Sequence, residues 1–280
     1  MNSEWCEPYS KATPDLEAAD RCMQFQLGIF AHPIYVNGDF PELIKKLVAN
    51  HSAAVNITSR LPVLTSQEQS LINATADYFG LNHYTTILAE AKEMYTGNTT
   101  EQKYEADQNL VKRHRDSWPL TGAYGFRKVP WGIRKLLKYI HENYRAKIFV
   151  TENGCVVPGE TNLEPPARLN DDFRVDFFKR YSNEILKAIR LDGVNVMGQL
   201  AWTLMDNFEW GEGYTTPFGV FYVDHSGNDP QLKRIAKASA TFWKELTRER
   251  GFVRASSERT TSLSKIFAIL LVIGGLQLHW

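Results

Sequence analysis

Apolar residues recur three and four positions apart in four stretches of the chain, which is the spacing of amphipathic helices. These stretches lie within 43–47, 133–140, 175–189 and 232–246. Thr65, followed three positions later by Glu68, predicts a capping box that opens one more helix. Pro130 stands where the 133–140 helix would begin, and Gly193 can end the 175–189 helix in a left-handed cap. The pattern therefore predicts a helix-rich chain.

Apolar runs without strict polar alternation lie between these helices, at 79–84, 148–151 and 194–204. Such runs are typical of strands that are covered on both faces. Their alternation with helices predicts an α/β fold with a parallel sheet. Each run also ends in a cluster of polar or aromatic residues, and in parallel α/β proteins the chemistry gathers at the carboxyl ends of the strands. Functional residues are therefore expected in these three clusters.

The charge and composition of the chain argue against two classes of protein, nucleic-acid-binding proteins and disordered proteins. The 280 residues carry 32 basic and 32 acidic side chains, which gives no electrostatic basis for binding nucleic acid. A hydrophobic content of 43% excludes the signature of a disordered chain. The length allows one large domain or two small ones.

Two of the strand ends carry candidate catalytic groups. Glu152 follows the 148–151 run directly, and a carboxylate at the mouth of a buried strand needs hydrogen-bond donors or a cation-like substrate centre. A glutamate that merely caps the next helix is the alternative. Asn82 and Tyr84 alternate with His83, so their side chains face the same side of their strand. Packing and capping at the strand end would also explain this pair.

The segment 201–214 is the densest in chemistry. It holds two tryptophans, one tyrosine and three carboxylates in fourteen residues. Flat aromatic faces beside carboxylates suit a sugar, whose C–H groups stack on the ring while its hydroxyls donate to the oxygens. A charged loop with structural tryptophans is the alternative.

Several motifs together resemble glycoside hydrolase family 1, with its lactase and lactase-like β-glucosidase branch nearest. They are Ser-Arg-Leu-Pro at 59–62, Gly-Leu-Asn-His-Tyr-Thr at 80–85, Thr-Glu-Asn-Gly at 151–154 and Trp-Thr-Leu-Met-Asp-Asn-Phe-Glu-Trp at 202–210. The resemblance covers roughly residues 2–252 and implies a TIM (β/α)8 barrel, of which this chain holds about strands 5 to 8 with their helices. It also implies retaining hydrolysis of β-linked glycosides, and it implies no metal or organic cofactor.

The resemblance assigns roles to individual residues. Glu152 matches the nucleophile, and Tyr84 matches the tyrosine that orients it. The substrate-binding positions are matched by Asn82, by Trp202 as the floor of the sugar site, by Glu209 as the acceptor for hydroxyls 4 and 6, and by Trp210 and Phe218 as the rest of that wall.

The family's second glutamate, the acid/base, belongs to an Asn-Glu-Pro motif that this sequence lacks. Glu7 precedes Pro8, but this stretch resembles a Trp-x-Glu-Pro segment that follows strand 5 of the family barrel. Retaining hydrolysis needs two carboxyl groups about 5 to 5.5 Å apart. We therefore expect negligible hydrolysis of unactivated β-glycosides by this chain alone. We expect the sequence to be an incomplete gene model or isoform. The alternatives are a partner that supplies the missing barrel half and pairing of two copies of the chain. The competing hypothesis is a non-catalytic, membrane-anchored pseudoenzyme that binds sugar or a protein partner.

The cysteines, the glycosylation sequons and the end of the sequence bear on the cellular compartment and on membrane attachment. Cys6 and Cys22 could form a bridge or stay as thiols, Cys155 is a third cysteine, and no signal peptide begins the chain. Four glycosylation sequons suggest a lumenal, secretory-pathway ancestry: Asn50, Asn56, Asn73 and Asn98. We expect residues 1–252 to form the barrel half, residues 253–265 a Ser/Thr-rich linker, and residues 266–280 a hydrophobic tail. The tail is a candidate membrane anchor or GPI signal, with a buried terminal helix as the alternative.

Overall fold

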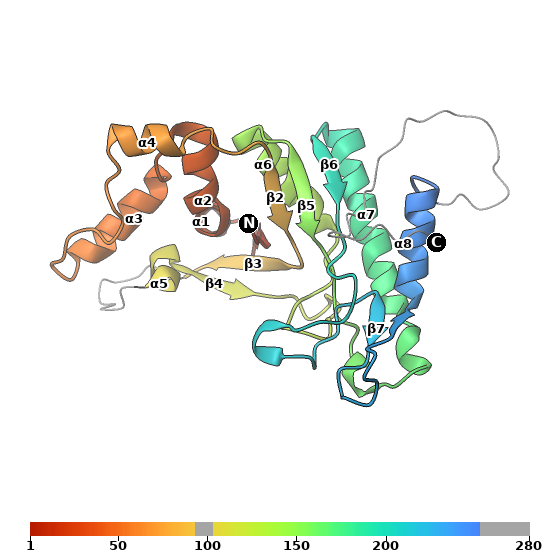
Figure 1. The fold of residues 1–280 in the computed structure, drawn as a ribbon. Coiled ribbons are helices and arrows are strands. Elements are labelled where there is room, and N and C mark those ends of the chain that lie inside the picture. Colours follow the sequence, from red (N-terminus) through yellow and green to blue (C-terminus); the bar gives the residue numbers. More distant parts are fainter. Residues whose placement is uncertain (93–102, 253–280) are drawn as a thin grey trace.

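The computed structural model describes residues 1–92 and 103–252 of the chain. Figure 1 shows the arrangement of its helices and strands. The helices are α1 (Thr13–Met23), α2 (Ile29–His32), α3 (Glu42–Ala53), α4 (Ser66–Ile72), α5 (Tyr104–Gln108), α6 (Trp131–Tyr144), α7 (Asp172–Asp192) and α8 (Ala238–Arg248). Within these described residues, five short turns of π- or 3-10-helix lie at Gln24–Gly28, Pro33–Asn37, Glu160–Asn162, Ala167–Leu169 and Trp210–Glu212.

In the part of the chain that the structure describes, the strands form three small sheets. Their bounds are β1 (Trp5–Pro8), β2 (Phe79–Asn82), β3 (Thr86–Ala91), β4 (Leu110–Arg113), β5 (Ile148–Glu152), β6 (Val196–Gln199), β7 (Phe221–Val223) and β8 (Arg234–Ala236). β5 pairs in parallel with β2 on one side and with β6 on the other. β3 pairs in parallel with β1 and antiparallel with β4, and β7 pairs antiparallel with β8.

Four parallel segments lie side by side in sequence order at the centre of the fold. The first is the start of the chain, where Asn2 pairs in parallel with Asn82 beside β2, and the others are β2, β5 and β6. Helices α6 and α7 connect the last three and pack against each other, and Figure 1 shows the three strands running in the same direction. The predicted α/β class with a parallel sheet is therefore confirmed.

The core lies between this sheet and its helices. Ile133, Leu136, Leu137 and Ile140 of α6 are fully buried, as the helical spacing predicts, and Ile148 and Val150 of β5 are buried with them. Large aromatic side chains complete the core from α7 and α8: Phe177, Phe178, Tyr181 and Trp243. The helices consequently pack against one face of the parallel strands, and loops follow the carboxyl ends of these strands.

The predicted helix ends agree with the structure at two positions. Thr65 and Glu68 form the capping box of α4, and Gly193 ends α7 with a φ of 71°. The 232–246 helix was predicted too long, because Arg234–Ala236 pairs with β7 and the helix begins only at Ala238. The 194–204 run is likewise a strand only over Val196–Gln199, after which the Leu200 amide still donates to Val150 before the chain turns away.

Candidate active site at the carboxyl ends of the parallel strands

Glu152 is the last residue of β5, and the residues after it tie it to both neighbouring strands. The buried Asn153 side chain donates to the His83 carbonyl at 2.7 Å and accepts from the Gln199 amide at 3.1 Å. The Trp202 amide donates to the Asn153 carbonyl at 2.9 Å. The carboxyl ends of β2, β5 and β6 are thus joined through one asparagine, which fixes where Glu152 emerges.

Tyr84 donates its phenolic hydrogen to the Glu152 carboxylate. Burial and the neighbouring Glu152 carboxylate raise the pKa of Tyr84 far above its usual value, so Tyr84 remains a donor at any physiological pH. The backbone supports the same pair, because the His83 amide donates to the Glu152 carbonyl at 3.0 Å. Asn82 lies alongside, and its side-chain oxygen accepts from the Thr151 hydroxyl at 2.6 Å.

Glu209 brings a second carboxylate to this place. Its side chain is 5% exposed and accepts a hydrogen bond from the Tyr124 hydroxyl at 3.2 Å. Burial and the charge of Glu152 raise the pKa of Glu209, whereas hydrogen bonds from the side chains of Trp202 and Tyr124 act in the opposite direction. Glu152, Trp202 and Glu209 therefore share one electrostatic environment.

Phe218 and Trp210 occupy very different positions. Phe218 is 2% exposed and packs edge-on against Tyr84, with ring centroids 6.1 Å apart. Trp210 directly follows Glu209 but is 81% exposed in the described part of the chain. The structure thus brings Glu152, Tyr84, Trp202, Glu209 and Phe218 together, with Asn82 beside them, and leaves Trp210 projecting from the surface.

Glu7 lies elsewhere. Its carboxylate accepts from the Lys135 ammonium at 2.7 and 2.8 Å and from the Trp5 indole at 2.7 Å. These contacts connect β1 to α6. Among the described residues, neither of these two donors forms a hydrogen bond with Glu152, so Glu7 belongs to a separate group of interacting side chains.

A buried ion network holds the loop that carries Trp202 and Glu209. Lys237 donates to Glu160 at 2.6 Å and to Asp206 at 3.1 Å, and Arg174 donates to Glu160 and to Asp171. All five side chains are at most 5% exposed. Asp206 also accepts from the Gly219 amide at 2.8 Å, so the network links both ends of the loop to α7 and to the start of α8.

The sequence profile of "Glycosyl hydrolase family 1" matches residues 1–252. The chain belongs to glycosyl hydrolase family 1. Human lactase/phlorizin hydrolase is 40% identical over 90% of this chain and 13% of its own length, and human cytosolic beta-glucosidase is 38% identical over 88% of this chain and 50% of its own length. The human lactase-like protein is 38% identical over 90% of this chain and 43% of its own length.

Solved structures of beta-glucosidases superpose closely on this chain. Beta-glucosidase 2 from Trichoderma reesei superposes with a TM-score of 0.78 at 34% identity, over 89% of this chain and 51% of that protein. A beta-glucosidase from Humicola insolens, crystallised with glucose, gives 0.78 at 36% identity over 89% and 50% of the two chains. This family 1 chain thus spans about half the length of the solved relatives it matches.

Three residues of this family 1 site were missed by sequence reasoning: Tyr124, Thr151 and Asn153. Thr151 and Asn153 lie inside a motif that was already singled out, and their neighbours in space become clear only once β2 and β6 are placed. Tyr124 lies in the connection between β4 and α6, where no periodic pattern or motif marks it. Its contact with Glu209 joins positions 85 residues apart, which local sequence does not reveal.

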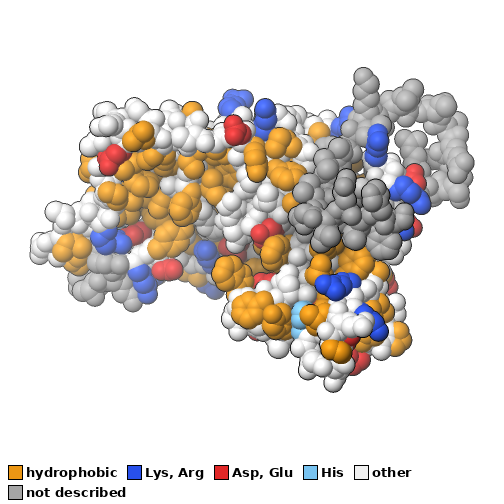
Figure 2. Space-filling view, in the orientation of Figure 1, with side chains coloured by type: hydrophobic (Ala, Val, Ile, Leu, Met, Phe, Trp, Pro, Cys, Tyr) orange, Lys and Arg blue, Asp and Glu red, His pale blue; other side chains and the backbone are white. Residues whose placement is uncertain are grey.

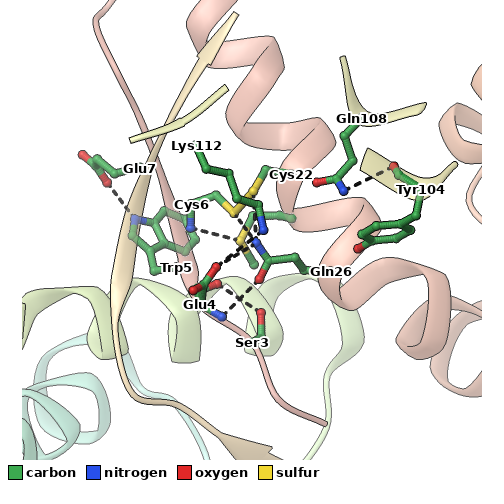
Figure 3. Close-up of a disulfide and its surroundings, with 11 residues drawn as sticks. Ser3, Glu4, Trp5, Cys6, Glu7, Cys22, Gln26, Tyr104, Gln108 and Lys112 are labelled. Carbon is green, nitrogen blue, oxygen red and sulfur yellow. Dashed lines mark hydrogen bonds and ion pairs between the residues drawn. A yellow bond between two sulfur atoms is a disulfide. The ribbon is translucent and has the colours of Figure 1, made fainter. Parts of the chain in front are cut away.

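The sequons and cysteines have definite places in the described parts of the family 1 chain. Asn50, Asn56 and Asn73 are exposed on and around α3 and α4, whereas Asn98 lies outside the described residues. Cys6 and Cys22 form a disulfide between β1 and α1, as Figure 3 shows. Cys155 is a buried thiol, and burial raises its pKa to about 12.

Two further kinds of site concern metal ions and membranes. Within residues 1–92 and 103–252, no group of three or more His, Cys, Asp or Glu side chains is arranged to hold a metal ion. In the same two ranges, every helix is too short or too polar to cross a bilayer. The predicted tail at 266–280 and the linker at 253–265 lie outside the described residues.

Proposed function

We propose that this chain is the carboxy-terminal half of a retaining β-glycosidase of the β-glucosidase and lactase type, with Glu152 as its nucleophile. The observation that carries this proposal is the hydrogen bond from Tyr84 to Glu152 at the carboxyl end of β5. A carboxylate held by a half-buried tyrosine keeps one oxygen lone pair aimed and ready for attack. In this reaction the Glu152 oxygen bonds to the anomeric carbon as the glycosidic C–O bond breaks, and water later releases the sugar.

The sugar-binding wall is proposed from the surrounding side chains. The Trp202 ring provides a flat face for the C–H groups of the sugar, and Glu209 accepts hydrogen bonds from its hydroxyls. Phe218 backs this wall from the buried side, and Asn82 flanks the nucleophile. Trp210 projects into solvent here, so its part in the wall requires a substrate or further protein to pack against it.

The acid/base carboxyl group is proposed to come from outside this sequence. The sequence contains no Asn-Glu-Pro, and Glu7 is already bound by Lys135 and Trp5. General acid–base assistance is worth about 10² to 10⁴ in rate. Lactose and cellobiose, whose leaving groups need protonation, should therefore not be hydrolysed detectably by this chain alone.

The partner that completes the site is proposed to be the other half of a family 1 barrel. The solved relatives are about twice as long as the matched region, which covers 50 to 51% of them. Figure 2 shows hydrophobic side chains gathered over a broad part of one face, and several large apolar side chains are exposed, among them Phe30, Tyr78 and Met197. A broad gathering of apolar side chains such as the one in Figure 2 is typical of an interaction surface. A second copy of the chain is the other occupant to test.

A fluorinated substrate tests the nucleophile without needing the acid. The reagent 2,4-dinitrophenyl 2-deoxy-2-fluoro-β-glucoside has a leaving group that departs unprotonated, and its fluorine slows release of the covalent sugar. We expect one fluoroglucosyl group per chain, mapped to Glu152 by peptide mass spectrometry, and no label in Glu152→Gln. Labelling that persists in Glu152→Gln, or Glu152-dependent turnover of cellobiose by the purified chain, would contradict this account.

The compartment is proposed from the disulfide and the sequons. Disulfides persist in oxidising compartments, and three exposed sequon asparagines lie on the α3–α4 flank. We propose a glycoprotein of the secretory pathway or cell surface, attached by the 266–280 tail.

Two experiments test this proposal. Deglycosylation with peptide N-glycosidase should increase the electrophoretic mobility of the chain isolated from cells, and the double substitution Asn56→Gln with Asn73→Gln should reduce that shift. Release by phospholipase would assign the tail as a lipid-attachment signal rather than a span.

A further inference from the structure

Tyr124 lies at the tip of a short hairpin between β4 and α6. Leu120 and Arg127 pair in antiparallel fashion, and the Thr121 amide donates to the Phe126 carbonyl at 2.8 Å. The Phe126 amide donates to the Ala123 carbonyl at 3.1 Å, which closes a four-residue turn. Both central residues of this turn have positive φ, 55° at Tyr124 and 68° at Gly125.

A tyrosine is an unusual residue at this position. Turns with positive φ at both central residues favour Asn, Asp or Gly at the first of them, because a larger side chain crowds the backbone. Such strained positions persist where surrounding contacts hold them, and they concentrate at functional sites. The turn geometry therefore does not explain why a tyrosine occupies position 124, and the contacts of its side chain must do so.

The hairpin is held firmly on both sides. The Gly122 amide donates to the Val156 carbonyl at 2.8 Å, and the Thr85 hydroxyl donates to the Arg127 carbonyl at 3.0 Å. The Tyr124 ring stacks on Phe218, with centroids 6.4 Å apart and planes inclined by 22°. The loops that follow β2 and β5 thus fix the direction of the Tyr124 hydroxyl, which donates to Glu209 at 3.2 Å.

The acceptor capacity of Glu209 is then divided between protein and ligand. An ionised carboxylate has about four lone-pair positions. The Tyr124 hydroxyl occupies one of them at 3.2 Å, and the side chain of Trp202, whose hydrogen bond lowers the pKa of Glu209, competes for a second. Two positions remain, which is the number that two neighbouring hydroxyls of a sugar would use.

We propose that Tyr124 is a positioning residue of the sugar site, whose hydroxyl fixes the Glu209 carboxylate so that its two remaining acceptor positions face the hydroxyls of a hexose. This proposal rests on the sugar-binding function proposed above. It adds a residue and a consequence for specificity: a hexose, which can fill both positions, depends on Tyr124 more than a pentose without the hydroxymethyl group does.

The charged and titratable groups that face Glu209 come from several elements. Glu152 ends β5, Tyr84 follows β2, and Glu212 lies one helical turn along the same loop and faces Tyr124. Burial and Glu152 raise the pKa of Glu209, and the hydrogen bonds from Trp202 and Tyr124 oppose that rise. Removing one hydroxyl should consequently be visible in the titration of Glu209 itself.

The test compares Tyr124→Phe, which loses only the hydroxyl, with Tyr214→Phe, another exposed tyrosine whose ring stacks on His225. Carboxyl ¹³C shifts of labelled glutamate, assigned with Glu209→Gln, give the pKa of Glu209 in each chain. Calorimetry with a glucose-configured glycoimidazole and its xylose-configured counterpart gives the two affinities. We expect Tyr124→Phe to raise the pKa of Glu209 and to weaken the glucose-configured ligand about tenfold, as for a hydrogen bond to a charged group. The xylose-configured ligand should weaken clearly less, and Tyr214→Phe should change neither quantity.

An unchanged pKa of Glu209 in Tyr124→Phe, or equal weakening of both ligands, would overturn the proposal. If the wild-type chain binds neither ligand while the pKa still rises, the proposed sugar-binding function fails and the coupling of Tyr124 to Glu209 is upheld. The two proposals are thereby distinguished.

Discussion

Gly154 lies directly against the carbonyl oxygen of Trp202, and a Cβ added to this glycine would stand 1.8 Å from that oxygen. The contact brings the loop after β5 onto the segment after β6, so one close backbone approach sets the positions of Glu152 and Trp202 relative to each other. Only glycine permits this distance, because every other residue carries the Cβ.

Gly154→Ala is therefore expected to destabilise the chain by roughly 1 to 3 kcal/mol, since the backbone must move to relieve the clash. Urea unfolding followed by tryptophan fluorescence measures the change. Gly211→Ala is the matched control, because a Cβ there meets nothing within 4 Å. Equal stability of Gly154→Ala and the wild-type chain would show that the two loops are not held in contact.

Tyr84→Phe tests the orientation of Glu152. The change removes the hydroxyl that donates to the carboxylate while the ring keeps its packing on Phe126, whose centroid lies 5.7 Å away. We expect covalent labelling of Glu152 by the fluorinated glucoside to slow about tenfold or more, as for a lost hydrogen bond to a charged group. Tyr9→Phe, an exposed tyrosine beyond the end of β1, should label at the wild-type rate. A rate in Tyr84→Phe that matches wild type would remove Tyr84 from the orienting role.

Sequence pattern predicted the parts of this fold that depend on local chemistry. The helical spacing around Ile133 and the capping box at Thr65 are local signals, and the α6 and α4 helices follow them. The motif at 151–154 also predicted a strand end, because an apolar run stops there at a carboxylate and a glycine.

Contacts between distant segments escaped that reasoning. Arg234–Ala236 has helical spacing, yet it forms β8 because its backbone pairs with β7. The ion network around Lys237 and the Tyr124–Glu209 contact likewise join loops that only the folded chain brings together. The sequence therefore indicated that the candidate residues follow the parallel strands, but it could not predict the contacts that hold these residues in place.

Lys237→Met tests whether the buried ion network stabilises the loop that carries Trp202 and Glu209. The side chain is 1% exposed and donates to both Glu160 and Asp206, so its removal leaves two buried carboxylates without that cation. Breaking a buried charge network in this way costs about 3 to 5 kcal/mol. Lys138→Met is the control, because Lys138 and Glu142 form an exposed pair on α6, and such pairs contribute at most about 1 kcal/mol. Chemical unfolding of both variants gives the comparison, and a loss in Lys237→Met as small as in the control would show that the network does not stabilise the loop.

His83 gives the chain a specific pH dependence. Its imidazole is fully buried, one ring nitrogen lies 2.9 Å from the Ser3 carbonyl, and burial lowers its pKa from 6.5 to about 4. Between these two values the unfolded chain binds a proton that the folded chain does not. His83 thus lowers stability as pH falls from 6.5 towards 4, by up to about 1.4 kcal/mol per pH unit and about 3 kcal/mol in all.

Urea unfolding between pH 7 and pH 4.5 measures this dependence, and His83→Gln isolates it. Glutamine can still donate an N–H towards Ser3 but does not titrate, so the variant should lose less stability than the wild-type chain as the pH falls. The difference between the two slopes, rather than either stability alone, reports the proton taken up by the unfolded histidine. Parallel slopes for the two chains would mean that His83 titrates equally in the folded and unfolded states, and hence that the connection it makes between the start of the chain and β2 is open to water.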